Sequence, residues 1–139
     1  MSIHEIFVDG GGCFTLPEPA RQDLLSLPAD ELVATPGAKF KLQPELAFIP
    51  LNCVLFWTRS EHLDLQRALA SLPADVENAP GLRRRLLDMA HLLSPDGQGR
   101  LCLPQTLRDI VPLAGAALLR KREGRYELWS SSGFQCRIR

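Results

Sequence analysis

Short runs in which apolar and polar residues alternate occur along much of the chain, and a period of two is typical of β-strands with one buried face. The runs predict strands at residues 3–8, 13–16, 100–103, 116–122 and 126–130. A further hairpin is expected from the apolar runs 46–49 and 53–58, which flank a turn at residues 50–52. Residues 29–44 mix Pro, Gly, Lys and Thr, so we expect an irregular connection with one short strand at residues 32–34.

Apolar residues spaced three and four apart predict two longer helices. The first is expected to begin at an N-cap of Ser60 and to stop at Pro73, and the second to end near His91. Two shorter helices are expected after Pro17 and Pro104, because proline is tolerated in the first turn of a helix. The pattern as a whole indicates strands with interspersed helices.

One local pattern occurs twice. Residues 9–21 (DGGGCFTLPEPAR) and 96–108 (DGQGRLCLPQTLR) match at a constant offset of 87 residues. Each copy consists of a polar turn with glycine, a short strand and a proline that opens a helix. Two such units can bury together a core that neither forms alone. We therefore expect a first repeat with its following helix at residues 1–73 and a second repeat at residues 74–139, which together form one compact domain.

The formal net charge of zero conceals an asymmetry between the two halves of the chain. Residues 1–70 carry 5 basic and 9 acidic side chains, whereas residues 71–139 carry 11 basic and 7 acidic ones. An anionic partner is therefore expected to meet mainly the second half.

Composition excludes several classes of protein. The chain has no apolar run near the ~20 residues that span a bilayer, and it begins without a secretory signal, which indicates a soluble cytoplasmic protein with no membrane partner. Cysteines 13, 53, 102 and 136 lack the spacing of a zinc site, so reduced, partly buried thiols are expected rather than a metal centre. Nothing in the sequence places Cys13 beside His4 or His62 as a thiol nucleophile with its base, so we expect no enzyme.

The second turn unit resembles the corresponding part of the MraZ family of bacterial transcriptional regulators. The resemblance rests on Asp96–Pro104 with Arg108 after it, and on Tyr126–Trp129 at the end of the last predicted hairpin. The family's middle section is similar to residues 53–57, 61–73 and 83–87. The match covers nearly the whole chain.

This resemblance implies a mainly β fold with helices (α+β), in which two repeats form an intramolecular double-split, AbrB-like swapped-hairpin barrel. It also implies a homo-oligomer, in this family a ring, that associates with the nucleoid and binds repeated promoter boxes in double-stranded DNA upstream of the division and cell-wall gene cluster. Members of the family carry no cofactor, catalyse nothing and take no small-molecule substrate. The family's D-x-x-x-R motif corresponds to Asp96 and Arg100, and Cys13 stands where the family normally has an arginine.

Arg100 is the first candidate for DNA contact, because it lies at the exit of a tight turn, where a guanidinium can donate two parallel hydrogen bonds to a phosphate or a guanine edge. The alternative is an ion pair with Asp96 that clamps the turn. Asp96 itself is expected to cap the turn, since phosphates repel a carboxylate. The residues expected to shape the two turns are Asp96, Gly97, Gly99, Asp9 and Gly12.

Five further arginines are candidates for DNA contact. Adjacent helical residues point about 100° apart, so we expect one of Arg83, Arg84 and Arg85 to contact a phosphate, with Arg85 or Arg84 favoured. The alternative is that all three form a solvated face. Arg108 either packs its stem or contacts a phosphate, and Arg21 is its counterpart in the first repeat.

Two hypotheses for function follow. The first is a sequence-specific DNA-binding regulator, in which one weak reading unit per subunit gains affinity by avidity around the oligomer. The second is a protein-interaction or assembly module of the same fold that has lost DNA readout, which Cys13 and the acidic first half favour. A salt titration distinguishes them, because phosphate binding weakens steeply as salt rises.

Overall fold

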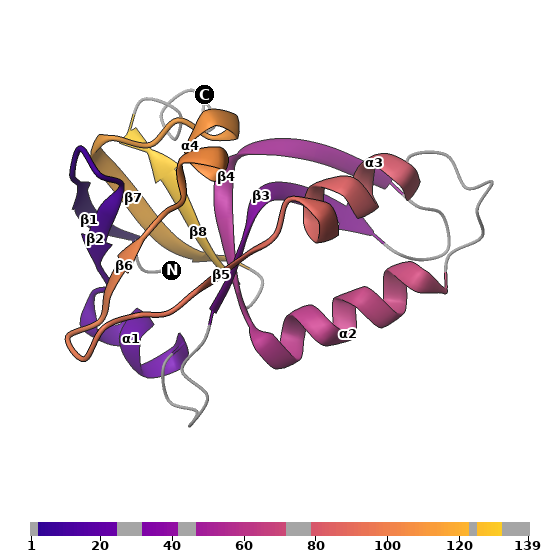
Figure 1. Ribbon diagram of the computed structural model, residues 1–139, viewed down its shortest axis with the longest axis horizontal. Helices are drawn as coiled ribbons and strands as arrows, with labels where there is room; N and C mark the ends of the chain where they lie inside the picture. The colour runs from indigo at the N-terminus through magenta and orange to yellow at the C-terminus, as the bar shows by residue number, and fades with distance from the viewer. Residues whose placement is uncertain (1–2, 25–31, 42–46, 72–78, 123–124, 132–139) are drawn as a thin grey trace.

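The described strands form one large antiparallel sheet and one small strand pair (Figure 1). The computed structural model describes residues 3–24, 32–41, 47–71, 79–122 and 125–131. In these ranges the strands are β1 (Ile3–Val8), β2 (Cys13–Thr15), β3 (Leu32–Lys41), β4 (Ala47–Thr58), β5 (His91–Leu93), β6 (Arg100–Cys102), β7 (Gly115–Arg122) and β8 (Arg125–Ser130). The large sheet has the order β1-β7-β8-β4-β3-β5, and β2 pairs with β6.

Strands from the two repeats are interleaved. The first strand of each repeat pairs with a strand of the other repeat: β1 lies antiparallel to β7, and β5 lies antiparallel to β3. The short strands β2 and β6 pair with each other, and β4 lies beside β8. The mainly β, α+β class is thus confirmed, but the expected closed barrel is not formed. Within the described residues β1 and β5 are the outer strands of an open sheet, because each pairs on one side only.

The region before the first long helix differs most from the sequence prediction. The supposed irregular connection at residues 29–44 contains the ten-residue strand β3, and the supposed hairpin at residues 46–58 is the single strand β4. The two pair from Leu32 opposite Thr58 to Lys41 opposite Ala47. The register shifts between Pro36 and Gly37, because Asn52 and Cys53 of β4 have no opposite residue on β3, and this interruption of the ladder tolerates the proline that is typical of a loop.

The helices follow the predicted order, with corrected ends. The short helices α1 (Glu18–Leu24) and α4 (Gln105–Ile110) follow their prolines as expected. The long helix α2 (Arg59–Ala70) starts earlier than predicted, because Thr58 rather than Ser60 is its N-cap. The Thr58 hydroxyl accepts a hydrogen bond from the Glu61 N–H at 3.1 Å, and the Glu61 carboxylate accepts one from the Thr58 N–H at 2.9 Å. The predicted stop at Pro73 lies outside the described residues.

The second long helix consists of two short pieces. Helix α3 (Ala79–Arg83) continues into a π-helical turn, η1 (Arg84–Asp88), which ends before the predicted boundary at His91. His91 instead begins β5, so the expectation of a helix-terminal histidine is wrong. No helix within the described ranges is both long enough and apolar enough to span a bilayer.

Two hydrophobic clusters of buried residues stabilise the part of the fold that the structure describes. One joins the large sheet to β2, β6, α1 and α4, and the other joins β3 and β4 to α2, α3 and η1. Adjacent residues of β4 belong to different clusters, since Phe56 lies in the first and Trp57 in the second. Figure 1 shows the same division, with α2 and α3 along β3 and β4 at one end and the β2–β6 pair at the other. The two repeated turns therefore rest on the first cluster.

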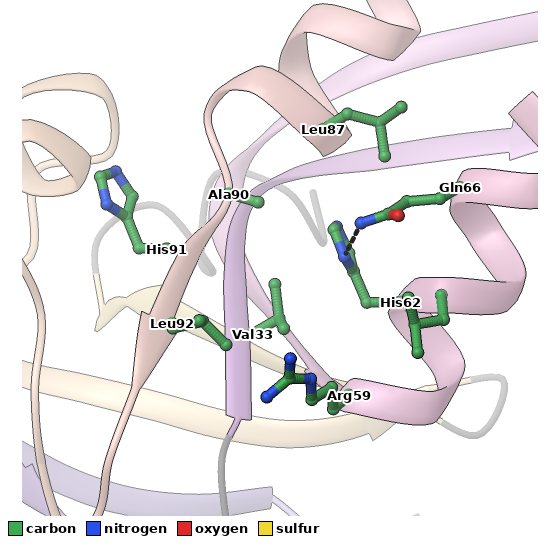
Figure 2. A pocket seen from close by; sticks show the side chains of 9 residues that line it. Val33, Arg59, His62, Gln66, Leu87, Ala90, His91 and Leu92 are labelled. Atoms are coloured by element: carbon green, nitrogen blue, oxygen red, sulfur yellow. Dashed lines mark hydrogen bonds between the residues drawn. The ribbon is translucent and has the colours of Figure 1, made fainter. Parts of the chain in front are cut away.

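A groove of about 250 Å³ opens between α2, η1 and β5 (Figure 2). Buried His62 donates from Nε2 to the Leu86 carbonyl oxygen at 2.8 Å, and Gln66 donates to its Nδ1 at 3.2 Å. Two of the lining side chains, Leu63 and Leu92, are 43% and 59% exposed. The groove thus presents apolar surface beside an outer strand of the sheet.

Candidate nucleic-acid interface

Each repeat presents a tight turn that an aspartate closes. In the first turn, Oδ1 of Asp9 accepts hydrogen bonds from the backbone N–H groups of Gly11 and Cys13, both at 2.9 Å. In the second, Oδ1 of Asp96 accepts one from the backbone N–H of Arg100 at 3.0 Å. The backbone hydrogen bond from Cys13 is the main cause that lowers the pKa of Asp9 below its ordinary value. The backbone hydrogen bond from Arg100 does the same for the pKa of Asp96. Asp9 and Asp96 therefore cap equivalent turns.

An arginine of the opposite repeat packs on each turn. Gly12 has a φ of +83° and Gly99 a φ of +78°, a conformation that favours glycine. The side chain of Arg108 lies against Gly12, and that of Arg21 lies against Gly99. Both guanidiniums also donate, at 3.1 Å, to the carbonyl oxygen five residues earlier in their own repeat. Arg21 and Arg108 thus hold the two turns together, which for Arg108 is the stem packing that was one of its two expected roles.

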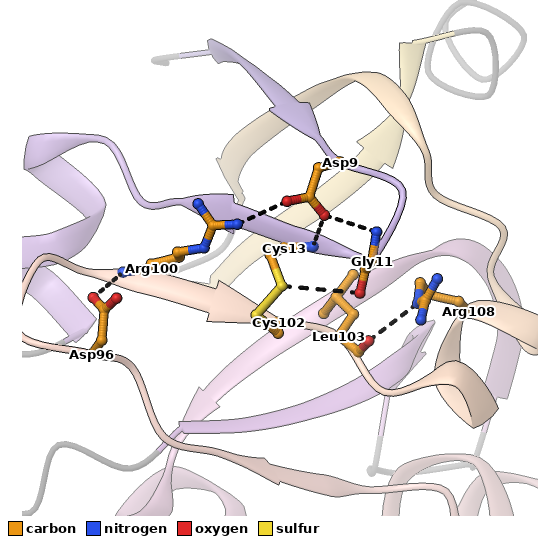
Figure 3. The surroundings of a disulfide bond; sticks show 8 residues. All are labelled: Asp9, Gly11, Cys13, Asp96, Arg100, Cys102, Leu103 and Arg108. Carbon is orange, nitrogen blue, oxygen red and sulfur yellow. Dashed lines mark hydrogen bonds and ion pairs between the residues drawn. A yellow bond between two sulfur atoms is a disulfide. The ribbon is translucent and has the colours of Figure 1, made fainter.

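Arg100 lies at the exit of the second turn and forms an ion pair across the repeats. Its Nη2 donates to Oδ2 of Asp9 at 2.8 Å (Figure 3), so the structure pairs it with Asp9 rather than with Asp96. The side chains of Arg100 and Asp9 are 50% and 40% exposed, which leaves the guanidinium accessible from solvent. Sequence patterns do not indicate Asp9 as a partner, because the pairing depends on the alignment of β2 with β6, in which Thr15 is opposite Arg100.

The three consecutive arginines have different environments. Arg83 donates from Nε and Nη2 to the Leu69 carbonyl oxygen near the end of α2, at 3.1 and 2.9 Å. Arg85 donates to the carbonyl oxygens of Gly37 at 2.6 Å and Leu51 at 2.8 Å, and burial lowers its pKa. Arg84 is exposed. Of the three, Arg84 is the one whose side chain faces solvent.

Cys13 and Cys102 form a disulfide, so the prediction of reduced thiols is wrong for this pair. They lie directly opposite each other on β2 and β6, with their Cα atoms 3.9 Å apart. No local pattern indicates this bond, because the two cysteines are 89 positions apart and meet only through the strand register. Cys53 is a buried free thiol whose pKa burial raises, and Cys136 lies outside the described residues.

We call the surface formed by Asp9, Cys13, Arg100 and Cys102 the β2–β6 surface. Figure 3 shows these side chains together beside the strand pair, with Arg108 at the other end of β6. Within the described ranges no cluster of three His, Cys, Asp or Glu side chains could hold a metal ion. The arrangement offers two turns closed by hydrogen bonds and an accessible guanidinium, which suits recognition of an anion or a base edge.

Comparison with known proteins identifies the family. No protein-family model matches the chain. The transcriptional regulator MraZ of Hydrogenovibrio crunogenus is 31% identical over 134 residues, which cover 95% of this chain and 80% of that protein. MraZ of Shewanella amazonensis is 30% identical over 133 residues and MraZ of Alkalilimnicola ehrlichii 30% over 133, each match covering 96% of this chain. The chain belongs to the MraZ family.

Membership of the MraZ family confirms the resemblance that the second turn unit indicated. The MraZ matches extend over both repeats, since they cover about 95% of the chain. The structure brings Arg21, Arg100 and Arg108 to the β2–β6 end of this MraZ-family fold, whereas Arg83 and Arg85 bind backbone carbonyls of the other end. The candidate arginines therefore do not share one surface.

Proposed function

We propose that this chain is a sequence-specific DNA-binding transcriptional regulator and that Arg100 contacts the DNA. The observation that carries the proposal is the position of the Arg100 guanidinium, half exposed at the exit of a turn that Asp96 caps through the backbone. The planar guanidinium presents its donors in a fixed fork, so it loses little entropy for each hydrogen bond that it forms with a phosphate or a base edge. Similarity to relatives named transcriptional regulators supports the same conclusion.

The DNA in this proposal consists of repeated promoter boxes upstream of the division and cell-wall gene cluster, as the family resemblance implies. The protein would then act in the cytoplasm at the nucleoid. Arg84 adds a phosphate contact in this scheme, since its side chain is exposed. Arg21 and Arg108 position the turns, and we assign Arg83 and Arg85 to the fold because backbone carbonyls already bind them.

We also propose that the subunits assemble head to tail into a ring. The large apolar side chains that are exposed in the described ranges occur at two places. Ile3 and Phe7, 46% and 69% exposed, lie on the outer strand β1, and Leu63 and Leu92 line the groove beside the outer strand β5. Two different apolar surfaces on one subunit suit a heterologous contact, which closes into a ring when the rotation permits. In a ring, several weak DNA contacts act together, which would raise the affinity for DNA by roughly 10²–10⁴ over that of one subunit.

Substitution of Arg100 by alanine tests the DNA contact. Arg100→Ala should abolish the mobility shift of DNA from upstream of the protein's own gene and leave the oligomer, measured by light scattering, unchanged. Arg67→Ala is the matched control, because Arg67 is a 78% exposed arginine on α2 and its replacement changes the net charge equally. Equal affinities of the two variants would refute the assignment.

A protein-interaction or assembly module of the same fold is the second candidate. It is favoured by the ion pair with Asp9, which offsets the charge of Arg100 on the surface where DNA would bind. No DNA binding by the wild-type protein even at low salt would support this alternative, because phosphate contacts are strongest under those conditions.

A further inference from the structure

The disulfide links the two strands that carry the turns. Cys13 lies opposite Cys102 in the antiparallel β2–β6 pair, and the bond joins the first repeat to the second. Cys102 is exposed and Cys13 is half-buried. A small thiol can therefore reach the bond, whereas the free thiol of Cys53 is buried.

The same disulfide is connected to Arg100 through Asp9. The backbone N–H of Cys13 donates to Oδ1 of Asp9 at 2.9 Å, and Oδ2 of Asp9 accepts from Nη2 of Arg100 at 2.8 Å (Figure 3). Arg100 in turn precedes Cys102 by two residues on β6. The covalent bond therefore adds a constraint to the strand pair that carries both Asp9 and Arg100.

Other contacts hold β2 against β6 when the disulfide is open. Phe14 is opposite Leu101, and both side chains lie in the first hydrophobic cluster with at most 2% exposure. The Leu103 N–H donates to the Gly12 carbonyl oxygen at 2.9 Å, and the equivalent hydrogen bond of the other repeat measures 3.0 Å. Opening the disulfide should loosen the pair without unfolding it, which provides the two folded states that a switch requires.

We propose that Cys13 and Cys102 form a reversible modification site for low-molecular-weight thiols of the glutathione type, and that opening the disulfide raises the affinity for DNA. The second part rests on the proposed function. With the disulfide closed, the Asp9 carboxylate neutralises Arg100 and repels phosphate. With it open, the Asp9 turn can move away and release the guanidinium. Because exposed ion pairs are weak, the expected gain is up to about fivefold in affinity for each subunit that contacts DNA.

The exchange reaction balances with glutathione as the reductant. A glutathione thiolate attacks Sγ of the exposed Cys102, the S–S bond breaks, and Cys13 leaves as a thiolate. A second glutathione thiolate then attacks the glutathione sulfur of the mixed disulfide and releases the Cys102 thiolate together with oxidised glutathione. Two electrons pass from the two glutathione molecules to the protein, and the protons lost by their thiols go to the two cysteines. Oxidised glutathione drives the reverse reaction.

Peptide mapping tests the modification site without DNA. The full-length protein is equilibrated in buffers of different ratios of reduced to oxidised glutathione, alkylated with N-ethylmaleimide and digested. We expect a cross-linked Cys13–Cys102 peptide at oxidising ratios and two alkylated peptides at reducing ratios, reached from either direction. Cys136→Ser should show the same transition, and Cys102→Ser should not. A cross-link that never forms, or one that persists at the most reducing ratio, would overturn the proposal.

DNA binding by the two redox forms tests the coupling. The probe is a duplex from upstream of the protein's own gene, and we expect tighter binding by the reduced form. Asp9→Asn keeps the Oδ1 acceptor for the turn but removes the charge opposite Arg100, so its affinity should not respond to reduction. Equal affinity of the two wild-type forms would overturn the coupling. If neither form binds, the proposed function fails with the coupling, while peptide mapping decides on the thiol site by itself.

Discussion

Arg108 of the second repeat packs its side chain directly on Gly12 of the first. A Cβ atom added at Gly12 would lie 2.5 Å from Nε of Arg108 and 2.9 Å from the carbonyl oxygen of Leu103. Arg21 and Gly99 make the equivalent contact, with 2.6 Å between such a Cβ and Nε of Arg21. Each turn is thus shaped to receive a side chain from the other half of the molecule.

This packing predicts that Gly12→Ala destabilises the protein. The alanine would have to adopt a φ of +83° and displace Arg108, which should lower the free energy of unfolding by about 1–3 kcal/mol. Gly10→Ala is the matched control, because a Cβ at Gly10 meets nothing within 4 Å. Urea unfolding of the two variants measures the difference. Equal midpoints would mean that Arg108 does not define the turn.

Neighbouring arginines should behave differently when each is replaced by alanine. Arg85→Ala removes two hydrogen bonds to the backbone carbonyls of Gly37 and Leu51, so it should lower the free energy of unfolding by about 1–3 kcal/mol. Arg84→Ala changes an exposed side chain and should stay within about 0.5 kcal/mol of wild type. Thermal unfolding separates the two. For DNA binding we expect the opposite result. Arg84→Ala should decrease the affinity for DNA, whereas Arg85→Ala protein that is folded should bind DNA as tightly as wild type.

Reduction of the disulfide should lower stability. A cross-link between residues 89 positions apart restricts the unfolded chain strongly, and loop-closure entropy gives about 4–5 kcal/mol as an upper value for its contribution. Unfolding in denaturant with and without dithiothreitol measures the contribution. Cys102→Ser should unfold at the same denaturant concentration under both conditions. If the wild-type midpoint were the same with and without dithiothreitol, the disulfide would not constrain the unfolded state.

The chain has one tyrosine, and its titration should occur at unusually high pH. Burial, and then the 2.7 Å hydrogen bond that Tyr126 donates to Asp23, raise the pKa of Tyr126 to about 12. Because the folded-state pKa lies above the ordinary value of 10.0, the phenol contributes stability below pH 10, and this contribution is lost as the pH rises toward 12. Tyrosinate absorbance measures the titration directly.

Asp23→Asn provides the comparison for Tyr126. The substitution removes the negative charge beside the phenol, so the pKa should fall toward 10 but remain above it, since burial is the larger cause. A wild-type tyrosine that titrates at its ordinary value would contradict the Tyr126–Asp23 contact.

Local patterns predict well the parts of the fold that depend on nearby residues. The glycine turns, the short strands after them and the helices that follow Pro17 and Pro104 are all found as predicted, since each is determined within a few positions. The long pairing of β3 with β4 is not predicted, because Pro36 and Pro50 mark loops in most sequences. Here the register shift beside Pro36 accommodates the proline within β3. This irregular pairing is favourable only because β4 lies alongside.

The sequence predicts which residue types occur in the candidate site, but not which of these residues contact one another. The repeated turn points to Arg100 and Asp96, and both lie where that turn predicts. The contact of Arg100 with Asp9 and the bond between Cys13 and Cys102 depend on how β2 aligns with β6. That alignment involves segments almost 90 positions apart, which no local pattern specifies.

The interleaving of the repeats also determines when the chain can fold during synthesis. Strand β1 is translated before the other described strands, yet its hydrogen-bonding neighbour in the large sheet is β7, where Ile3 is opposite Arg120. Strand β1 therefore stays without this partner until residues 115–122 have been translated. A premature stop before Gly115 should leave a product without a partner for β1, exposed to proteases and prone to aggregation.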